Sequence, residues 1–278
     1  MSKVWFITGA GRGIGAHIVQ SALAAGDRVV ATGRSLAQLR DAFGGIDSAR
    51  IALVAFDVAD ATQAGGAVQA ALAAFGRIDV VVNNAAYGQL GRFEEVSSED
   101  TERQFAVNVH GVMHVLRAAL PVLRSQRSGH IINIASIAGV TGFDGASIYC
   151  ASKYAIEGLS ASLALEVARF GIRVTVVEPG FFRTGFLEPA SVRYGESAIA
   201  DYADQPTVED AYRPYNGAQL GDPAKLGRAI VSLAAMAAPP LQFLAGSDAL
   251  AMAQAAVEAR VQSMAAMAAL SASTDTAN

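Results

Sequence analysis

Short apolar runs rich in β-branched residues alternate along the chain with longer stretches in which apolar residues recur at helical spacing. The short runs begin at Lys3, Arg28, Ile51, Ile78, His130, Ile172 and Leu241. Helical spacing covers residues 15–25, 36–43, 62–75, 99–123, 147–170 and 223–237. This order predicts a strand followed by a helix, repeated along the chain.

The predicted strands are apolar on both faces, as in the run "DVVVN" at residues 79–83. Strands of this kind suit a parallel sheet that helices cover on both sides. We therefore predict an α/β fold with one doubly wound parallel sheet of about seven strands and helices on both faces. A single domain is expected over residues 1–270, because no repeat or linker interrupts the pattern.

Two segments depart from this alternation. Residues 181–220 show no clear period, and the segment is too long for an ordinary connection between a strand and a helix. Its phenylalanines, tyrosines and glycines predict a lid that closes over a substrate. Residues 271–278 are rich in Ser and Thr and are expected to form a disordered tail.

The composition narrows the class of protein. With 278 residues, of which 52% are hydrophobic and 17% charged, the chain can bury a large core. The net charge of -4 and the lack of clustered Lys and Arg argue against nucleic acid as a partner. No apolar run reaches the ~20 residues that span a bilayer, and the N-terminal run is too short for a signal sequence. These features predict a cytoplasmic protein that does not bind membranes.

Neither cysteine nor histidine predicts a metal site. Cys150 is the only cysteine, which excludes an internal disulfide and a cysteine-based zinc cluster, and it is expected to be a small buried hydrophobe. His110 and His114 have the i, i+4 spacing of a helical metal site, but no third ligand accompanies them. We expect a structural or interface role for these two histidines.

The segment "TGAGRGIG" at residues 8–15 follows the first predicted strand directly. Its Gly9, Gly13 and Gly15 allow the backbone to approach a pyrophosphate at the N-terminus of the next helix. The G-x-G-x-x-G fingerprint is not met, because Ile14 stands where its third glycine is required. A glycine-rich turn without a ligand is the alternative, but the position between a strand and a helix favours a dinucleotide site.

Tyr149 and Lys153 are four residues apart in a predicted helix, so they project from the same face. An ammonium one turn away could lower the pKa of a phenol from ~10 towards ~7, which suits a proton donor at neutral pH. The alternative is a chance pairing on a surface helix, and these two residues alone do not decide between the two.

Several motifs occur in one order between Lys3 and Thr184, and together they resemble the short-chain dehydrogenase/reductase family. They are T-G-x-x-x-G-x-G at residues 8–15, "NNAA" at 83–86, Asn108, Ser136, Y-x-x-x-K at 149–153 and "PGFFRT" at 179–184. The family has the doubly wound sheet called the Rossmann fold. The segments "GDPAK" and "GSDAL" resemble the subgroup related to 17β-hydroxysteroid dehydrogenases, which does not identify a steroid as substrate.

The resemblance implies a role for each of four catalytic residues. Tyr149 would protonate the carbonyl oxygen of the substrate while hydride arrives from the nicotinamide, or act as the base in the reverse direction. Lys153 would lower the pKa of Tyr149 and hold the nicotinamide ribose. Ser136 would donate a hydrogen bond to the substrate oxygen, and Asn108 would hold a water that links Lys153 to solvent.

The resemblance also implies which residues contact the cofactor. Asp57 and Val58 would face the adenine, Asn83 would lie against the adenosine side, and Thr184 would meet the nicotinamide carboxamide. The full expected set is Thr8, Gly9, Gly11, Arg12, Gly13, Ile14, Gly15, Arg34, Asp57, Val58, Asn84, Ala85, Ala86, Tyr149, Lys153, Pro179, Gly180, Phe182 and Thr184.

The end of the second strand indicates which cofactor is preferred. An acidic residue near Thr32 or Gly33 would bind a ribose 2′-hydroxyl, but none is present. Arg34 follows at once and Arg12 lies in the glycine loop, and two guanidinium groups suit a 2′-phosphate. NADP(H) is therefore the predicted cofactor, although two solvent-exposed arginines would give the same pattern.

These predictions describe an oxidoreductase that uses NADP(H) to reduce a hydrophobic ketone or aldehyde, or to oxidise the alcohol. Two alternatives remain: the same fold and residues could serve an epimerase or dehydratase, or the chain could be a non-catalytic NADP(H)-sensing regulator. Family members usually pair through their fourth and fifth helices. Residues 102–123 and 151–170 are thus the expected faces of a homodimer or homotetramer.

Overall fold

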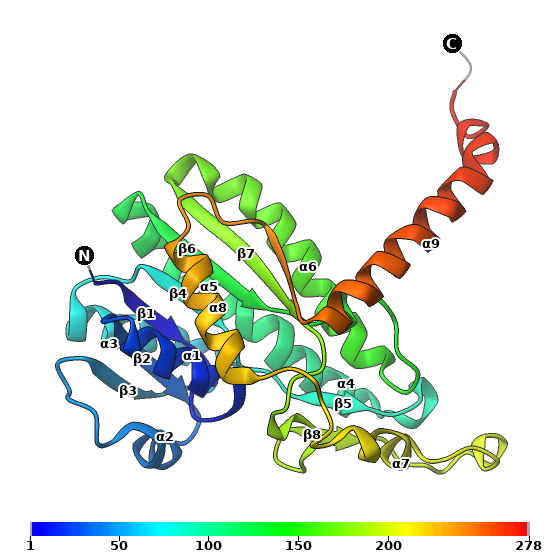
Figure 1. Cartoon of the computed structure of the whole chain (residues 1–278), viewed down its shortest axis with the longest axis horizontal. Helices are drawn as coiled ribbons and strands as arrows, with labels where there is room; N and C mark the ends of the chain where they lie inside the picture. The colour runs from blue at the N-terminus through cyan, green and yellow to red at the C-terminus, as the bar shows by residue number, and fades with distance from the viewer. Residues whose placement is uncertain (1, 277–278) are drawn as a thin grey trace.

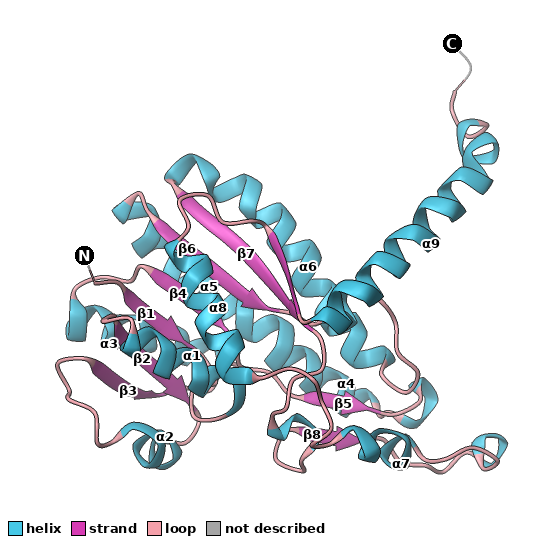
Figure 2. Ribbon diagram, in the orientation of Figure 1, coloured by secondary structure: helices cyan, strands magenta, loops and turns pink. Residues whose placement is uncertain are grey.

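The computed structural model describes residues 2–276. Its centre is a parallel sheet of seven strands in the order β3-β2-β1-β4-β6-β7-β9, which confirms the predicted doubly wound sheet (Figure 2). The strands are β1 (Val4–Ile7), β2 (Arg28–Gly33), β3 (Ile51–Ala55), β4 (Val80–Asn83), β6 (Gly129–Ile134), β7 (Ile172–Pro179) and β9 (Gln242–Ala245). The strand order reverses between β1 and β4, so the loops that follow these strands open a crevice at the carboxyl edge of the sheet.

Helices cover both faces of the sheet (Figure 1). One face carries α3 (Ala61–Phe75), α5 (Gly111–Gln126) and α6 (Ser147–Val167), and the other carries α1 (Gly13–Ala24), α2 (Leu36–Phe43) and α8 (Pro223–Ala235). Successive residues of β1 divide between the two cores, with Val4 and Phe6 in the first and Trp5 and Ile7 in the second. Side chains alternate in this way along any strand, which explains why the strand sequences are apolar throughout.

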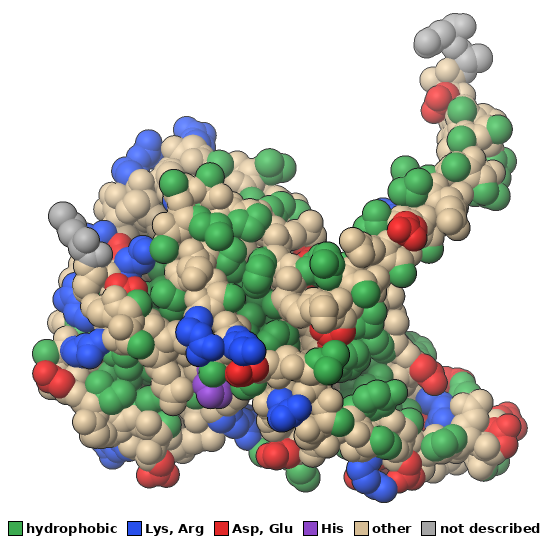
Figure 3. Space-filling view, in the orientation of Figure 1, with side chains coloured by type: hydrophobic (Ala, Val, Ile, Leu, Met, Phe, Trp, Pro, Cys, Tyr) green, Lys and Arg blue, Asp and Glu red, His purple; other side chains and the backbone are tan. Residues whose placement is uncertain are grey.

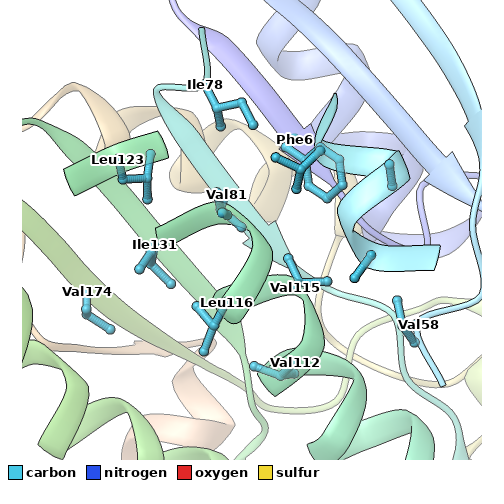
Figure 4. Packing of buried hydrophobic residues seen from close by; sticks show 14 of the residues in the cluster. Phe6, Val58, Ile78, Val81, Val112, Val115, Leu116, Leu123, Ile131 and Val174 are labelled. Atoms are coloured by element: carbon cyan, nitrogen blue, oxygen red, sulfur yellow. The ribbon is translucent and has the colours of Figure 1, made fainter. Parts of the chain in front are cut away.

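The core between the sheet and α5 holds the carboxyl edge in place. Figure 4 shows Phe6, Val81 and Ile131, from β1, β4 and β6, beside Val115 and Leu116 of α5. All five side chains are buried. Burying a side chain of this size contributes about 1.5–3 kcal/mol to the stability of the fold. The strand ends that carry the loops at this edge are therefore held in fixed positions.

The predicted helix at residues 99–123 is interrupted. α4 (Ser98–Phe105) is followed by a π-helical turn, Ala106–His110, before α5 begins. A π-helical turn holds one residue more than an α-helical turn and is frequent at functional sites. The whole stretch Ser98–Gln126 is long and apolar enough to cross a membrane by length and composition. Its apolar side chains, including Val112 and Leu123, are part of the core.

Residues 181–220 contain more regular structure than their sequence predicts. β8 (Val192–Tyr194) pairs in parallel with β5 (Gly88–Leu90), and α7 (Val208–Tyr212) follows. Figure 2 shows this small sheet outside the main sheet, beside α7. A strand of three residues has too few positions to display a period of two, so the pattern could not reveal it.

The C-terminal helix α9 (Ser247–Ala272) is also absent from the sequence prediction. Alanine dominates it and few polar residues mark an outer face, so no amphipathic period is visible. In Figure 1, α9 extends away from the body of the molecule. The tail expected at residues 271–278 begins within this helix, and residues 277 and 278 lie outside the described part of the chain.

Candidate active site

The glycine loop connects β1 to the N-terminus of α1. Gly9 and Gly13 have φ angles of 62° and 54°, in the left-handed region that favours glycine. A Cβ atom on Gly15 would lie 2.4 Å from the carbonyl oxygen of Gly9, so no side chain fits at that position. The three glycines therefore shape a tight loop at the crevice between β1 and β4.

Thr8 and Asn84 join this loop to the end of β4. The Thr8 hydroxyl accepts hydrogen bonds from the backbone N–H groups of Asn84 (3.0 Å) and Ala85 (3.1 Å). The side-chain Nδ2 of Asn84 donates to the carbonyl oxygens of Thr8 (2.9 Å) and Gly9 (3.1 Å). Both side chains thus fix the shape of the crevice.

Asn83 does not lie where the resemblance implied. It is buried in the sheet, and its Nδ2 donates to Oδ1 of Asn133 at 2.8 Å. The Nδ2 of Asn133 donates in turn to the hydroxyl of Ser160 on α6, also at 2.8 Å. Side chains at the end of a strand alternate between its faces, so Asn83 points into the protein while Asn84 contacts the glycine loop.

The N-terminus of α1 is suited to a pyrophosphate. Its first turn carries no acidic residue, and Arg12 at the N-cap position forms no side-chain cap, so the first backbone N–H groups are available. A Cβ atom on Gly13 would have only one neighbour within 4 Å, the Cβ of Thr184 at 3.9 Å. Space therefore remains between the glycine loop and the segment that follows β7. A dinucleotide in extended conformation would fit in this space.

The other residues expected at the cofactor occupy the same edge of the sheet, but not all of them offer a side chain. Arg34 is exposed at the end of β2, whereas the Val58 side chain packs in the core. Asp57 accepts a hydrogen bond from the backbone N–H of Ala59 at 3.0 Å. Phe182 packs with the core beneath α1 and α8. Arg12 donates a hydrogen bond to the backbone carbonyl of Ala190, which ties the glycine loop to the segment 181–220.

Ser136, Tyr149 and Lys153 lie together where β6 ends and α6 begins. The Ser136 hydroxyl accepts a hydrogen bond from the backbone N–H of Ala138 at 3.1 Å, and it is close enough to Tyr149 to lower the pKa of the phenol. Lys153 is 3% exposed, and its Nζ lies 5.7 Å from the centre of the Tyr149 ring. The same Nζ donates to the backbone carbonyl of Ile134 at 3.0 Å. The i, i+4 spacing thus places the half-buried phenol and the buried ammonium together, and the end of β6 brings the half-buried Ser136 hydroxyl beside them.

The pKa of Tyr149 moves in the direction opposite to the sequence prediction. Burial raises this pKa well above its ordinary value, because the anionic phenolate loses hydration, and the nearby Ser136 hydroxyl offsets only part of the effect. Burial also lowers the pKa of Lys153 to about 8. The prediction counted the attraction of the ammonium for the phenolate and left out this loss of hydration, which residues distant in sequence cause.

Asn108 is buried in the π-helical turn, and both the oxygen and the nitrogen of its side-chain amide form hydrogen bonds. Its Oδ1 accepts from the backbone N–H of Tyr87 (3.1 Å), and its Nδ2 donates to the Tyr87 carbonyl (3.0 Å) and the Ser152 hydroxyl (3.2 Å). Ser152 directly precedes Lys153 in the chain. Asn108 therefore links the loop after β4 to α6.

Aromatic side chains of residues 181–220 form a wall beside Tyr149. The Phe186 ring lies 5.5 Å from the Tyr149 ring, centre to centre. Phe181 packs edge-on against Phe143 at 6.0 Å and stacks on Tyr215 at 6.2 Å. Tyr202, which the sequence would place in the same group, instead packs on Arg92 and donates to Glu94, away from this wall.

A pair of carboxyl groups next to Lys153 is not predicted by any motif. Glu157 lies one turn beyond Lys153 on α6, close to Glu178 of β7. Burial and the charge of Glu178 raise the pKa of Glu157, so this side chain keeps its proton to a higher pH than an exposed glutamate. Gln242 of β9 donates to Glu178 at 3.2 Å. The i, i+4 spacing from Lys153 to Glu157 was the one sequence signal for this pair.

The two histidines considered as metal ligands differ in their surroundings. His110 is exposed, whereas the Nδ1 of His114 lies 3.0 Å from the carbonyl oxygen of Val58. Among residues 2–276, no group of three or more His, Cys, Asp or Glu side chains is placed to hold a metal ion. Cys150 is buried, as predicted.

Residues 3–194 match the family described as short chain dehydrogenase. The chain belongs to this family. It is 38% identical over 258 residues to the oxidoreductase BOA17 of Botryotinia fuckeliana, covering 93% of this chain and 94% of the relative. It is 34% identical over 249 residues to a 3-ketodihydrosphingosine reductase of Bacteroides thetaiotaomicron, covering 88% of each. The family assignment that the motifs implied is therefore confirmed, while the 17β-hydroxysteroid dehydrogenase subgroup stays a prediction.

Solved structures of the family have the same fold. A short-chain dehydrogenase from Streptomyces avermitilis superposes with a TM-score of 0.88 at 35% identity, covering 99% of both chains. A family member from Burkholderia phymatum, solved with NAD, gives a TM-score of 0.80 at 27% identity, covering 91% of this chain and 92% of that one. A metagenomic short-chain oxidoreductase solved with NADP gives 0.69 at 29% identity, covering 87% and 96%. The relatives thus support an oxidoreductase with a nicotinamide cofactor.

Proposed function

We propose that this protein is an NADP(H)-dependent carbonyl reductase, or in reverse an alcohol dehydrogenase, acting on hydrophobic ketones, aldehydes or the corresponding alcohols. The observation that carries the proposal is the cluster in which Tyr149 lies beside Ser136 and one helical turn from the buried Lys153, whose Nζ is 5.7 Å from the centre of the Tyr149 ring. Two hydroxyl groups beside an ammonium can receive a carbonyl oxygen and supply its proton.

Bound NADPH would supply a hydride to the carbonyl carbon. Ser136 and Tyr149 donate hydrogen bonds to the carbonyl oxygen, and these bonds strengthen as negative charge develops on it. Tyr149 then transfers its proton to that oxygen, and the Lys153 ammonium stabilises the phenolate that remains. Because burial holds the phenol neutral, Tyr149 keeps its proton until the substrate oxygen becomes basic enough to take it.

The preference for NADP(H) is supported by the end of β2. Thr32 is buried, Gly33 has no side chain, and Arg34 is the first exposed side chain after the strand. A carboxylate that could accept the ribose 2′-hydroxyl is absent from these positions, while a guanidinium can bind a 2′-phosphate with two hydrogen bonds. Since Arg12 is engaged with Ala190, Arg34 carries most of this preference.

The preference for hydrophobic substrates is supported by the aromatic wall. Phe186 lies against the Tyr149 ring, and Phe181 of the same segment packs on Phe143, so apolar rings would border a substrate bound at Tyr149. The name of the Bacteroides relative, a 3-ketodihydrosphingosine reductase, agrees with a ketone carrying a long apolar chain. Residues 181–220 would then act as the lid that excludes water from the hydride path.

A panel of ketones and aldehydes, with NADPH and NADH in parallel, tests the proposal through the absorbance of the reduced nicotinamide. Aliphatic and aromatic ketones of increasing size should be turned over with NADPH, and the corresponding alcohols with NADP. The variant Ser136→Ala removes one of the two proposed donors to the carbonyl oxygen and should lose most of this turnover. Turnover of substrate without net consumption of NADPH would instead indicate an epimerase or dehydratase. Binding of NADPH without any turnover across the panel would indicate a regulator.

A further inference from the structure

The motif "GSDAL" at residues 246–250 places one acidic side chain, Asp248, in the first turn of α9. The residues of this helix that are buried within the described chain, Ala249 and Ala253, pack with Ile137 in the loop after β6. Further along, the helix stands clear of the body of the molecule (Figure 3). The start of α9 is therefore the part that can act on the candidate active site.

The carboxylate of Asp248 joins α9 to the turn after β7, residues 180–184. Its Oδ2 accepts a hydrogen bond from the backbone N–H of Phe181 at 2.8 Å. Its Oδ1 accepts one from the backbone N–H of Ala249 at 2.9 Å. One side chain thus connects the backbone of the helix with the backbone of the turn.

Two glycines make room for this carboxylate. A Cβ atom on Gly180 would overlap Oδ1 of Asp248, and so would a Cβ atom on Gly246. Gly246 also has a φ angle of 107°, a conformation that favours glycine. The glycine of "GSDAL" and the glycine after Pro179 therefore have one physical reason in common, since both let a carboxylate lie against the backbone.

Asp248 is the side chain that completes the hydrogen bonds of this turn. The backbone N–H groups of Gly180, Arg183 and Thr184 donate to backbone carbonyl oxygens at 2.8–2.9 Å, whereas that of Phe181 donates to Asp248. Removal of the carboxylate would leave this N–H without its partner, so the turn would be free to shift.

The turn after β7 lies across the crevice from the glycine loop. The Cβ of Thr184 is 3.9 Å from the position that a Cβ atom on Gly13 would take. Under the proposed function, this turn contacts the nicotinamide end of the cofactor. A misplacement of about 1 Å in a group that orients a reacting ring can cost on the order of 100-fold in rate.

We propose that Asp248 is a positioning residue for the nicotinamide: it fixes the turn after β7 through Phe181, and the turn orients the ring for hydride transfer. The inference rests on the proposed function, because it requires a nicotinamide in the crevice. The adenosine end would bind near Arg34, at the end of β2, and β1, β4 and β6 separate β2 from β7 in the sheet. Asp248 should therefore affect one end of the cofactor and not the other.

The test compares the binding of NADPH with that of adenosine 2′,5′-bisphosphate, which lacks the nicotinamide, by titration calorimetry of the full-length protein. Asp248→Ala should weaken NADPH about tenfold and lower kcat about tenfold to 100-fold, while the Kd of the bisphosphate stays within about twofold of wild type. Asp248→Asn keeps one acceptor oxygen and should recover most of both losses. Glu258→Ala removes an exposed carboxylate from the same helix and should match wild type in all three measurements.

Gly180→Ala tests the same hydrogen bond from the other side. The atoms nearest to the added methyl group belong to the Asp248 carboxylate, so the methyl displaces this group from Phe181. The variant should reproduce the losses of Asp248→Ala, and the double variant should differ from either single variant by less than about twofold. If Asp248→Ala does not fold, Gly180→Ala decides alone, by weakened NADPH with unchanged bisphosphate.

Equal weakening of NADPH and the bisphosphate in Asp248→Ala would overturn the proposal, because it would indicate a general role in the fold. Losses that add up in the double variant, or wild-type behaviour of Asp248→Ala in all three measurements, would also overturn it and leave the proposed function intact. Wild type that binds neither ligand would instead overturn the proposed function, and this inference with it.

Discussion

The Phe186 ring lies against the Tyr149 ring, with their centres 5.5 Å apart and their planes inclined by 52°. Phe186 also packs on Gly88, where an added Cβ atom would come within 2.7 Å of the phenylalanine ring. One side chain from the segment 181–220 thus reaches both Tyr149 and the start of β5. This contact covers one side of the phenol, and under the proposed function it would border the substrate.

Phe186→Ala should change the choice of substrate more than the rate of proton transfer. Removal of the ring opens the space above Tyr149, so we expect kcat/KM for small ketones to fall about tenfold, while kcat/KM for bulky aromatic ketones is kept or increased. Steady-state kinetics on a series of ketones measures this. Phe93→Ala is the matched control, because Phe93 is 68% exposed. A uniform loss over the whole series would contradict the assignment of Phe186 to the substrate space.

Tyr149→Phe should retain NADPH binding and lose kcat by several orders of magnitude. The ring remains, so its packing on Phe186 is kept, but the proton donor and one hydrogen bond to the developing oxyanion are lost, which costs about 10²–10⁴-fold each. Tyr154→Phe, one residue beyond Lys153, is the control, since its hydroxyl bonds the backbone carbonyl of Val140. Activity of Tyr149→Phe above a tenth of wild type would refute the role given to Tyr149.

Arg34→Asp should weaken NADPH selectively. The change replaces a cation that can bind the 2′-phosphate by an anion that repels it and can accept the 2′-hydroxyl, so kcat/KM with NADPH should fall at least tenfold and that with NADH should rise. Arg40→Asp makes the same charge change on the exposed side of α2 and should leave the ratio unchanged. Equal efficiency of the wild type with both cofactors would show that Arg34 has no such role.

Glu157→Gln should remove part of the loss of stability with rising pH. The folded protein keeps the Glu157 proton up to a pKa of about 8, whereas the unfolded chain releases it near ~4.3, so folding free energy from this group is lost as the pH rises between these values. Denaturant unfolding at pH 5, 7 and 9 should show wild type losing about 1–2 kcal/mol more than the variant, after allowance for partial exposure. Glu166→Gln, at an exposed position of the same helix, should lose as much stability with rising pH as wild type. If Glu157→Gln also loses as much as wild type, Glu157 does not keep its proton in the folded state.

The segment 181–220 should become more protected when ligands bind. If it is a lid, amide hydrogen exchange of residues 186–215 should slow on addition of NADPH and a substrate analogue. Arg12→Ala removes the hydrogen bond to Ala190 and should speed exchange in this segment before ligands are added. Exchange that is the same with and without ligands would show a surface segment whose aromatic residues only pack on one another.

The sequence predicts well those parts of the site that depend on neighbours in the chain. The glycine loop is recognisable because its residues are consecutive, and Tyr149 and Lys153 because one helical turn separates them. The seven strands are recognisable because they are buried on both faces and therefore apolar throughout.

Features that depend on distant residues are harder to predict. The rise in the pKa of Tyr149 comes from burial, to which Phe186 contributes from a different segment. The proximity of Glu157 to Glu178 depends on how a helix packs on a strand, and no motif marks it. The helix α9 carries alanine and larger apolar residues on all sides, so the usual signature of a surface helix is missing.

The π-helical turn at Ala106–His110 has a genetic consequence. A helix with one surplus residue can lose it and close into a regular α-helix, so removal of one codon in this stretch leaves the chain able to fold. Each residue on one side of the deletion would then rotate by about 100° relative to the other side, and Asn108 would turn away from Tyr87 and Ser152. An in-frame deletion of three nucleotides here would therefore remove the link between the loop after β4 and Ser152 on α6.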